Sequence, residues 1–291
     1  MSNSPAPAPL VFLHYTQAEL DRNYDQRGWA PNALEVINRY PAQSEAALRA
    51  HPREADVPYG TSPDEVLDIF PCGKPGAPTQ VFVHGGAWRN FTKDDYSLVA
   101  AGFVPHGINL VIINFSKVLQ VPLPEMVEQT RRAIAWSVKN VSRWQGDPAR
   151  IYLSAHSSGA HQAAMALIKG FAAFGVADDA IRAAQFVSGP YDMEPVLLSA
   201  RSSYVKLDKQ QEHELSPARH ADRIRCPVFI AYAEHDTDEF QRHSREFAAA
   251  LERAGKLAGM QRFAGLNHFE IMEALGKPEG ELVRAIVARM T

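Results

Sequence analysis

Cysteine is scarce in this chain: of its 291 residues only Cys72 and Cys226 are cysteines, and they lie far apart. No C-x-x-C pair occurs, so the sequence indicates neither a disulfide framework nor a cysteine zinc site. His156 and His161 do not share a helical face in the way that the histidines of an H-E-x-x-H zinc motif do. Glycine-rich phosphate loops of the two common types are missing as well. We therefore expect no metal and no other cofactor.

The chain also has no large excess of charge and no long apolar run. Its formal net charge is -3, and no basic stripe stands out that would favour a nucleic acid. The longest apolar stretch, residues 163–177, is interrupted by Lys169 and two glycines, so no membrane-spanning helix is expected. Residues 1–10 contain no Lys or Arg and do not resemble a signal peptide. These features predict a cytoplasmic protein without nucleic-acid or membrane partners.

What the chain does have is the composition of a soluble globular protein, with 46% hydrophobic and 22% charged residues. Segments with strand character alternate with segments of helical periodicity, which is typical of a parallel sheet covered by helices on both faces. The clearest helical pattern runs over residues 123–141. The predicted strands are Val66–Phe70, Gln80–His84, Leu110–Phe115, Ile151–Ala155, Ala184–Ser188, Val228–Ala233 and Met260–Phe263.

No Gly/Ser linker and no break in composition divides the sequence, so residues 1–291 are predicted to form one α/β domain. The expected architecture is a three-layer αβα sandwich around a mostly parallel central sheet. Residues 1–60 and 190–225 are predicted to form a small cap, with helices in residues 16–50.

The most informative segment is Leu153-Ser154-Ala155-His156-Ser157-Ser158-Gly159, where a predicted strand turns into a predicted helix over residues 159–169. A serine on such a sharp turn is the nucleophile elbow of α/β-hydrolases. Its neighbours must be small because the turn is tight and its backbone approaches adjacent strands. A serine in a Ser/Gly turn is often structural, and Ala155 replaces the first elbow glycine. The position between a buried strand and a helix nevertheless predicts that Ser157 is a nucleophile.

A serine hydroxyl is a poor nucleophile unless a histidine removes its proton and a carboxylate orients that histidine. His268 follows the last predicted strand, and Asp236 follows the strand before it. The order serine, aspartate, histidine is the order found in α/β-hydrolases. Glu234 and Asp238 lie in the same loop as Asp236, and we predict that Asp238 caps the following helix instead.

A second motif, His84-Gly85-Gly86-Ala87-Trp88, follows the predicted strand Gln80–His84. Acyl transfer places negative charge on an oxygen, and backbone N–H groups aimed at that oxygen stabilise it. We predict that Gly86 and Ala87 donate from this loop and that Ser158 donates from the elbow. An ordinary glycine turn would explain the two glycines, but not their coincidence with an elbow.

Five further side chains are predicted to line the substrate pocket, each with a structural alternative. His84 is equally suited to holding its loop by hydrogen bonds, and His161 to packing around the elbow. For Trp88, Tyr191 and Phe269 the alternative is an ordinary place in the core.

Together these motifs resemble those of the kynurenine formamidases (arylformamidases). That family carries an HGGxW motif, similar to residues 84–88, and an HSAG-type elbow, similar to residues 156–159. Residues 188–192 and 214–217 look like its SGxYD and ELSP stretches, and residues 267–269 match its histidine loop. The resemblance covers nearly the whole chain. It departs at Ala87, where an aromatic residue is common, and a smaller side chain there would widen the pocket.

The resemblance implies a serine hydrolase of tryptophan catabolism that cleaves an aryl formamide such as N-formylkynurenine to an arylamine and formate, through an acyl-enzyme. A carboxylesterase, or an aryl carbamate or amide hydrolase, would use the same three residues. A catalytically inactive fold used as a binding module is a further alternative, although no triad residue is missing. The expected partner is a small aromatic amide or ester substrate, and a homodimer is compatible with the sequence.

Overall fold

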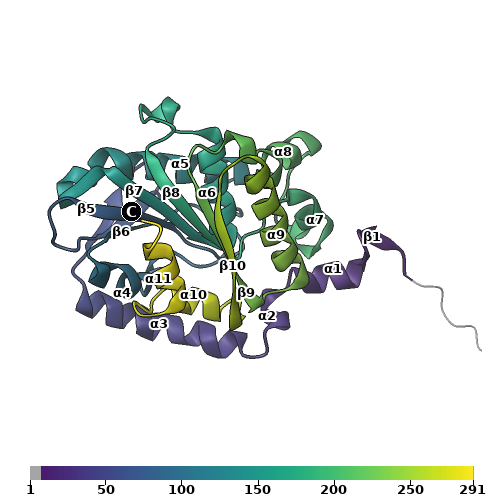
Figure 1. Ribbon diagram of the computed structural model, residues 1–291. Coiled ribbons are helices and arrows are strands. Elements are labelled where there is room, and N and C mark those ends of the chain that lie inside the picture. Colours follow the sequence, from purple (N-terminus) through teal and green to yellow (C-terminus); the bar gives the residue numbers. More distant parts are fainter. Residues whose placement is uncertain (1–7, 291) are drawn as a thin grey trace, which may run out of the picture.

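A computed structural model describes residues 8–290 and places eight strands in one sheet between two layers of helices (Figure 1). The order across the sheet is β10-β9-β8-β7-β5-β6-β4-β3. Adjacent strands from β10 to β6 run parallel, whereas β4 and β3 pair antiparallel at one edge. The strands are β3 (Glu54–Pro58), β4 (Val66–Phe70), β5 (Ala77–Val83), β6 (Asn109–Ile113), β7 (Gly146–His156), β8 (Ile181–Val187), β9 (Val228–His235) and β10 (Leu257–Asn267). The predicted three-layer, mostly parallel architecture is confirmed.

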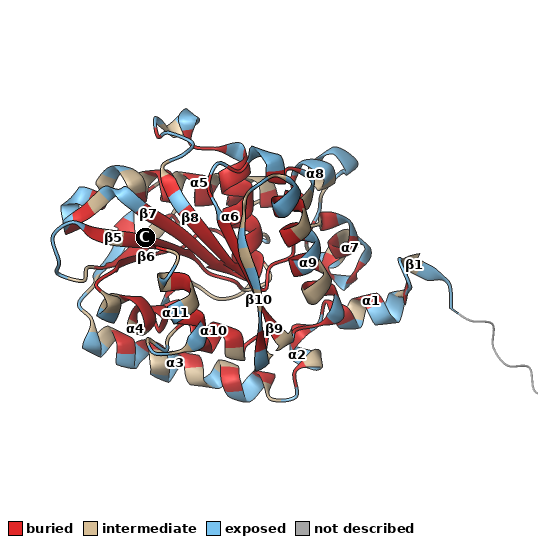
Figure 2. Cartoon of the chain, in the orientation of Figure 1, coloured by how far each residue is buried: buried red, intermediate tan, exposed pale blue. Residues whose placement is uncertain are grey.

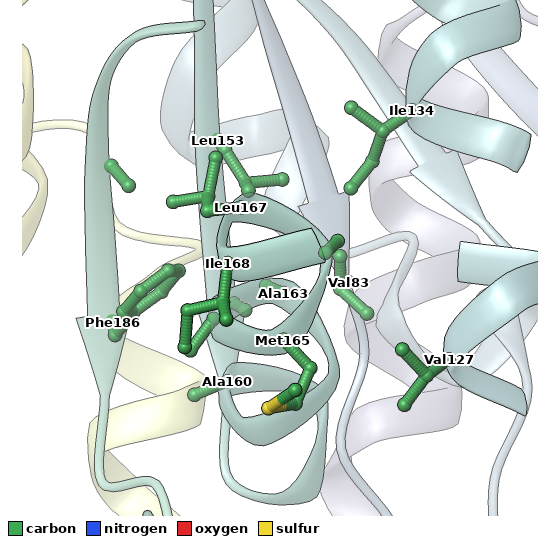
Figure 3. Packing of buried hydrophobic residues seen from close by; sticks show 14 of the residues in the cluster. Val83, Val127, Ile134, Leu153, Ala160, Ala163, Met165, Leu167, Ile168 and Phe186 are labelled. Atoms are coloured by element: carbon green, nitrogen blue, oxygen red, sulfur yellow. The ribbon is translucent and has the colours of Figure 1, made fainter. Parts of the chain in front are cut away.

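Alternate side chains of the central strands pack into two separate cores, one on each face of the sheet. Val81 and Val83 of β5 belong to the core that also contains Leu153 and Phe186 (Figure 3). Phe82, between them, belongs to the core on the opposite face. Because both faces are covered, these strands are buried along their length (Figure 2), which explains their continuous apolar sequence. Each fully buried aliphatic or Phe side chain contributes roughly 1.5–3 kcal/mol to stability.

Helices α5, α6 and α9 supply apolar residues to the first core, and α3, α4, α10 and α11 supply the second. None of the helices within residues 8–290 combines the length and the apolar character needed to cross a bilayer. The helices are α1 (Gln17–Asn23), α2 (Gln26–Trp29), α3 (Ala33–Ala50), α4 (Val99–Phe103), α5 (Leu123–Asn140), α6 (Ser158–Lys169), α7 (Met193–Leu198), α8 (Lys209–Glu214), α9 (Asp238–Arg253), α10 (Glu270–Ala274) and α11 (Glu281–Val287).

The segments predicted as a cap contain short helices and turns, but also α3, which packs into the second core, and β3, which is the edge strand of the sheet. Helices α1 and α2 and the short hairpin of β1 (Leu10–Phe12) and β2 (Tyr15–Thr16) precede the long helix α3. Between β8 and β9 lie α7, α8 and a one-turn 3-10 helix, η5 (Ala200–Ser203). Helices α1 and α7 contact each other, so the two predicted cap segments meet. Residues 1–7 of the predicted cap lie outside the described residues.

Candidate active site

Ser157 stands on a sharp turn between the end of β7 and the start of α6. Its backbone angles are φ 54° and ψ -128°, which are strained for a residue with a side chain. Its N–H donates to the carbonyl of Val187 at 2.8 Å, so the turn is tied to the neighbouring strand. A Cβ at Gly159 would lie 2.3 Å from the carbonyl oxygens of both Val83 and His84. Glycine is therefore required there, because the first turn of α6 packs directly against the end of β5.

Three side chains that are distant in sequence meet at this turn. His268 Nε2 lies 2.9 Å from Ser157 Oγ, and His268 Nδ1 lies 2.7 Å from Asp236 Oδ1. The parallel strands β7, β9 and β10 end at the same edge of the sheet. Each of the three residues directly follows the last residue of one of these strands. The structure therefore brings together the three predicted triad positions.

The surroundings of Asp236 determine which nitrogen of His268 carries the proton. The second carboxylate oxygen, Oδ2, accepts hydrogen bonds from the Ser188 hydroxyl at 2.6 Å and the Ala233 N–H at 2.9 Å. These donors satisfy Oδ2 and fix the orientation of the carboxylate. Asp236 Oδ1 is thus the acceptor for an N–H at His268 Nδ1, which leaves Nε2 to accept the proton of the Ser157 hydroxyl. Ser188 had no assigned role in the sequence, although it begins the 188–192 motif.

The neighbouring acidic residues occupy different positions. Asp238 is exposed and is the first residue of α9, whereas the Thr237 hydroxyl accepts from the Phe240 N–H at 3.4 Å. Thr237 is therefore the N-cap, and the prediction that Asp238 caps this helix is wrong. Glu234 accepts from the Gly265 N–H at 2.8 Å and does not contact His268.

The loop after β5 has an unusual backbone next to the elbow. Three successive residues, Gly86, Ala87 and Trp88, have left-handed φ values of 124°, 53° and 61°. Successive N–H groups in such a turn form a concave anion site. The Trp88 N–H donates to the Ser158 side chain at 3.1 Å, which fixes the loop to the start of α6. The Ser158 N–H belongs to the first turn of α6, where no partner within the helix exists. The loop that carries two of the predicted oxyanion donors is thus held against the turn that carries the third.

Gly86→Ala is expected to lower kcat by about 10²- to 10³-fold, the loss typical of a displaced oxyanion donor. A Cβ there would lie 1.9 Å from the Asn90 carbonyl oxygen, so the loop must move. Gly73→Ala is the matched control, because Gly73 also has positive φ but nothing lies within 4 Å of its Cβ position. Steady-state kinetics should show a normal kcat for the control. An unchanged kcat in Gly86→Ala would show that this loop does not contribute to the reaction.

Ser157 and His268 open into a cavity of about 710 Å³. Its walls come from α1 and α2, from the loop after β5, and from η5 and the residues that follow it. Gly86 and Ala87 line the cavity beside Ser157, and Phe269 lines it as predicted. The cavity is markedly aromatic; the aromatic side chains in its wall, apart from histidines, are Tyr24, Tyr40, Phe91, Tyr96, Tyr204 and Phe269.

Four predicted pocket residues lie behind this wall and not in it: His84, Trp88, His161 and Tyr191. Each is buried by specific contacts. The Trp88 indole N–H donates to His161 Nδ1 at 3.3 Å, and His161 Nε2 lies 2.8 Å from the Leu215 carbonyl. His84 Nδ1 lies 2.7 Å from the Gly85 carbonyl, and the Tyr191 ring stacks on Phe247 at 4.2 Å. For these four residues the prediction of a pocket position is wrong, and the structural alternative given for each of them is what the structure shows.

Burial lowers the pKa of both His84 and His161 to about 4, so both are neutral near pH 7. In the unfolded chain a histidine has a pKa near 6.5. As the pH falls from 6.5 towards 4, the unfolded chain therefore takes up protons that the folded protein does not. Stability that is fully present above pH 6.5 is lost in this range, by on the order of 3 kcal/mol per histidine.

We accordingly expect the free energy of unfolding in urea to fall between pH 7 and pH 5. His161→Gln removes one of the groups that take up a proton on unfolding, while the glutamine amide retains a hydrogen-bond donor and an acceptor. The slope of unfolding free energy against pH should be shallower in this variant. Equal slopes in the variant and the unmodified protein would show that His161 is not held neutral.

Comparisons with known proteins agree with this geometry. The profile of the BD-FAE family matches residues 67–251. A kynurenine formamidase of Danio rerio is 30% identical over 88% of this chain and 90% of its own length. The esterase LipQ of Mycobacterium tuberculosis is 31% identical over 73% of this chain and 59% of its own. A proposed thioesterase from Silicibacter has the same fold, with a TM-score of 0.80, 23% identity, and coverage of 92% of this chain and 99% of that one.

The fold resemblance and the sequence relatives point to one class of enzyme. The Silicibacter structure shares the mixed, mostly parallel sheet and its helical layers across almost the whole chain. The two sequence relatives are a kynurenine formamidase and an esterase. The chain therefore belongs to the BD-FAE family of α/β-hydrolases and is a hydrolase of the esterase and formamidase kind, related to the kynurenine formamidases.

Proposed function

We propose that this hydrolase cleaves aryl formamides such as N-formylkynurenine to the arylamine and formate. The observation that carries the proposal is that Ser157 and His268 open into a cavity whose wall holds six aromatic side chains. Aromatic rings pack favourably against an aryl substrate. The 30% identity to a kynurenine formamidase over most of both chains supports the same substrate class.

In the first half of the reaction, Ser157 Oγ attacks the formyl carbon while His268 Nε2 takes the hydroxyl proton. Asp236 holds the Nδ1 proton in place and stabilises the imidazolium that forms. The carbonyl oxygen becomes an oxyanion and accepts hydrogen bonds from the N–H groups of Gly86, Ala87 and Ser158. His268 then donates its proton to the leaving nitrogen. The C–N bond breaks, the arylamine departs, and the formyl group remains on Ser157.

In the second half, water replaces the arylamine. His268 removes a proton from the water as it attacks the formyl ester, and a second oxyanion forms in the same N–H cluster. Collapse of that intermediate returns the proton to Ser157 Oγ and releases formate. An aryl nitrogen leaves more readily than an alkyl amine, which suits a site of the kind that also cleaves esters.

The test compares kcat/KM for N-formylkynurenine with kcat/KM for short aryl esters, such as 4-nitrophenyl acetate, on the same preparation. The proposal expects turnover of the formamide at least as efficient as that of the esters. Efficient ester hydrolysis with negligible formamide cleavage would reject it.

A carboxylesterase is the second candidate, favoured by the 31% identity to the esterase LipQ. It would use the same serine, histidine and aspartate, so active-site variants do not separate the two functions. Only the substrate comparison does, because the C–N bond of an amide depends more strongly on proton donation by His268 than the C–O bond of an ester does.

A further inference from the structure

Arg201 in η5 is an arginine of the cavity wall with no acidic partner. Its side chain is buried, with 7% of the residue exposed. Within residues 8–290, no carboxylate lies within ion-pair distance of its guanidinium. The other arginines of the wall, Arg22, Arg27 and Arg89, are exposed to solvent. A buried charge without a counter-ion is costly, so its presence in the wall of the cavity that Ser157 also lines calls for an explanation.

The hydrogen bonds of Arg201 use only part of its capacity. Nε and Nη2 both donate to the carbonyl of Tyr24, at 3.3 Å and 3.0 Å, and Nη1 makes no hydrogen bond. A guanidinium has five N–H donors in a planar fork that matches a carboxylate. One neutral carbonyl therefore leaves both the charge and most of the donors unsatisfied.

Aromatic rings hold this guanidinium near the reaction centre. It lies 5.3 Å from the ring of Tyr24, 5.8 Å from that of Trp88 and 5.5 Å from that of Phe240. Phe240 in turn contacts the His268 ring edge-on, with 5.1 Å between centroids. Arg201 and the histidine of the relay thus pack against one shared ring.

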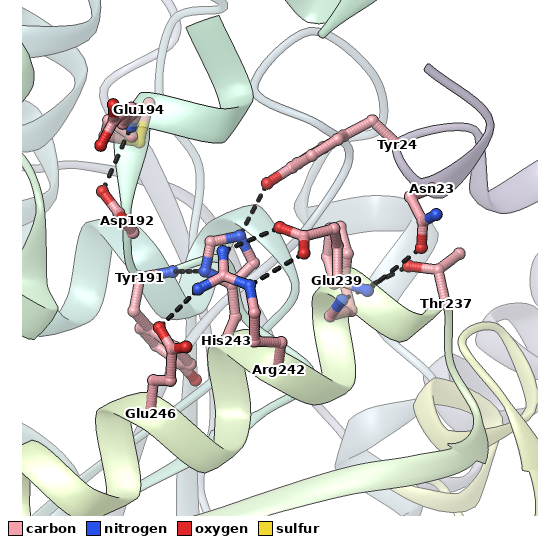
Figure 4. A network of polar contacts seen from close by, with 12 residues as sticks. Asn23, Tyr24, Tyr191, Asp192, Glu194, Thr237, Glu239, Arg242, His243 and Glu246 are labelled. Atoms are coloured by element: carbon pink, nitrogen blue, oxygen red, sulfur yellow. Dashed lines mark hydrogen bonds and ion pairs between the residues drawn. The ribbon is translucent and has the colours of Figure 1, made fainter. Parts of the chain in front are cut away.

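Tyr24, whose carbonyl accepts the hydrogen bonds of Arg201, is itself held in place. The Tyr24 hydroxyl lies 2.7 Å from His243 Nε2, and His243 Nδ1 accepts from the Tyr191 N–H at 3.3 Å. Figure 4 shows Tyr24, the residue that follows α1, directed onto this histidine of α9. A preorganised cation loses little conformational entropy when a ligand binds.

The charged residues of the cavity wall are mostly positive, like Arg201 itself. The wall contains four arginines against two aspartates, although the whole chain carries a net charge of -3. Both aspartates already accept backbone hydrogen bonds, Asp21 from the Ala200 N–H and Asp25 from the Gly28 N–H. Concentrated positive charge in a cleft attracts anionic ligands.

We propose that Arg201 binds a carboxylate on the leaving-group side of the substrate. The preferred substrates are then anionic aryl amides or esters, such as those of aromatic amino acids. This inference rests on the proposed function for the reaction type, but it concerns the charge of the substrate and not the bond that is cleaved.

The experiment uses two matched substrate pairs, each with a carboxylate or the corresponding carboxamide. The first pair is N-formylkynurenine and its amide. The second is the acetyl ester of 3-(4-hydroxyphenyl)propionic acid and of its propionamide. We expect the unmodified protein to prefer the carboxylate by about 10- to 100-fold in kcat/KM, the range for a charge-assisted hydrogen bond.

Arg201→Met should remove this preference, through KM, while turnover of the carboxamides changes less than about threefold. Arg143→Met is the control, because Arg143 also packs over two aromatic rings, those of Trp136 and Trp144 at 5.8 Å, but away from the cavity. Its carboxylate preference should equal that of the unmodified protein.

Several results separate this inference from the proposed function. A carboxylate preference seen with the esters, without formamide cleavage, would support Arg201 and reject the formamidase reaction. Formamide cleavage without a carboxylate preference would do the reverse. An equal loss on charged and neutral substrates in Arg201→Met would make Arg201 a structural residue. Should that variant fail to fold, the preference of the unmodified protein decides.

Discussion

Ser157→Ala is expected to lower kcat by about 10⁴-fold or more, because Ser157 Oγ, at 2.9 Å, is the hydroxyl that hydrogen-bonds His268 Nε2 in the described part of the chain. The free energy of unfolding should hardly change. The methyl side chain of alanine fits wherever the serine does, and the strained φ of 54° is present in both proteins. Steady-state kinetics on an aryl ester and urea unfolding measure the two quantities.

Ser154→Ala is the matched control for this variant. Ser154 is a fully buried serine of β7, the strand that leads into the turn at Ser157, and its hydroxyl makes no hydrogen bond within the described residues. It should retain normal kcat. Residual activity above about one per cent in Ser157→Ala, or a comparable loss in Ser154→Ala, would contradict a nucleophile at position 157.

Asp236→Asn is expected to lower kcat by about 10⁴-fold, for a different reason. An amide in this place can donate to His268 Nδ1, which then carries its proton on Nε2 and cannot accept from Ser157. The Ser188 hydroxyl and the Ala233 N–H would still hold the side chain in position. The loss should therefore appear in kcat, with substrate binding largely retained.

Asp238→Asn distinguishes the two aspartates of this loop. Asp238 is exposed at the first turn of α9, where its charge stabilises the helix by about 0.3–1 kcal/mol. Its replacement should slightly lower the unfolding temperature and leave kcat unchanged. A large loss of activity in Asp238→Asn, with a mild effect in Asp236→Asn, would show that Asp238 and not Asp236 orients His268.

The central part of the fold could be predicted because its strands are buried on both faces. Val66–Phe70 was predicted with its observed bounds, and the helix over residues 123–141 differs from α5 by a single residue at its end. Such segments are largely apolar, as in Val66–Phe70 with only Asp68 as an exception, or apolar at helical spacing, whatever the rest of the chain does. The edge strands carry a weaker pattern. β3 is mostly exposed and was not predicted, and only the middle of β10 was, because its exposed residues alternate with covered ones.

The positions of the triad could be predicted because each follows a parallel strand, and parallel strands end at one edge of the sheet. The pocket wall depends instead on contacts between distant segments. Tyr24 and Arg201 are separated by 177 residues and meet only in the folded protein. A buried arginine has no sequence signature that distinguishes it from an exposed one. Trp88, the aromatic residue that follows the loop glycines, was predicted to lie in the wall, whereas packing places it behind the wall.

The most direct measurement is labelling of the folded protein with a fluorophosphonate, followed by mass-spectrometric mapping of the modified peptide. A phosphonate reacts with a serine only when a neighbouring base removes its proton and the oxyanion is stabilised. We predict a single modification at Ser157, abolished in Ser157→Ala and strongly slowed in Asp236→Asn. Folded protein that stays unlabelled, or that is labelled at another serine, would contradict a working relay of these three residues.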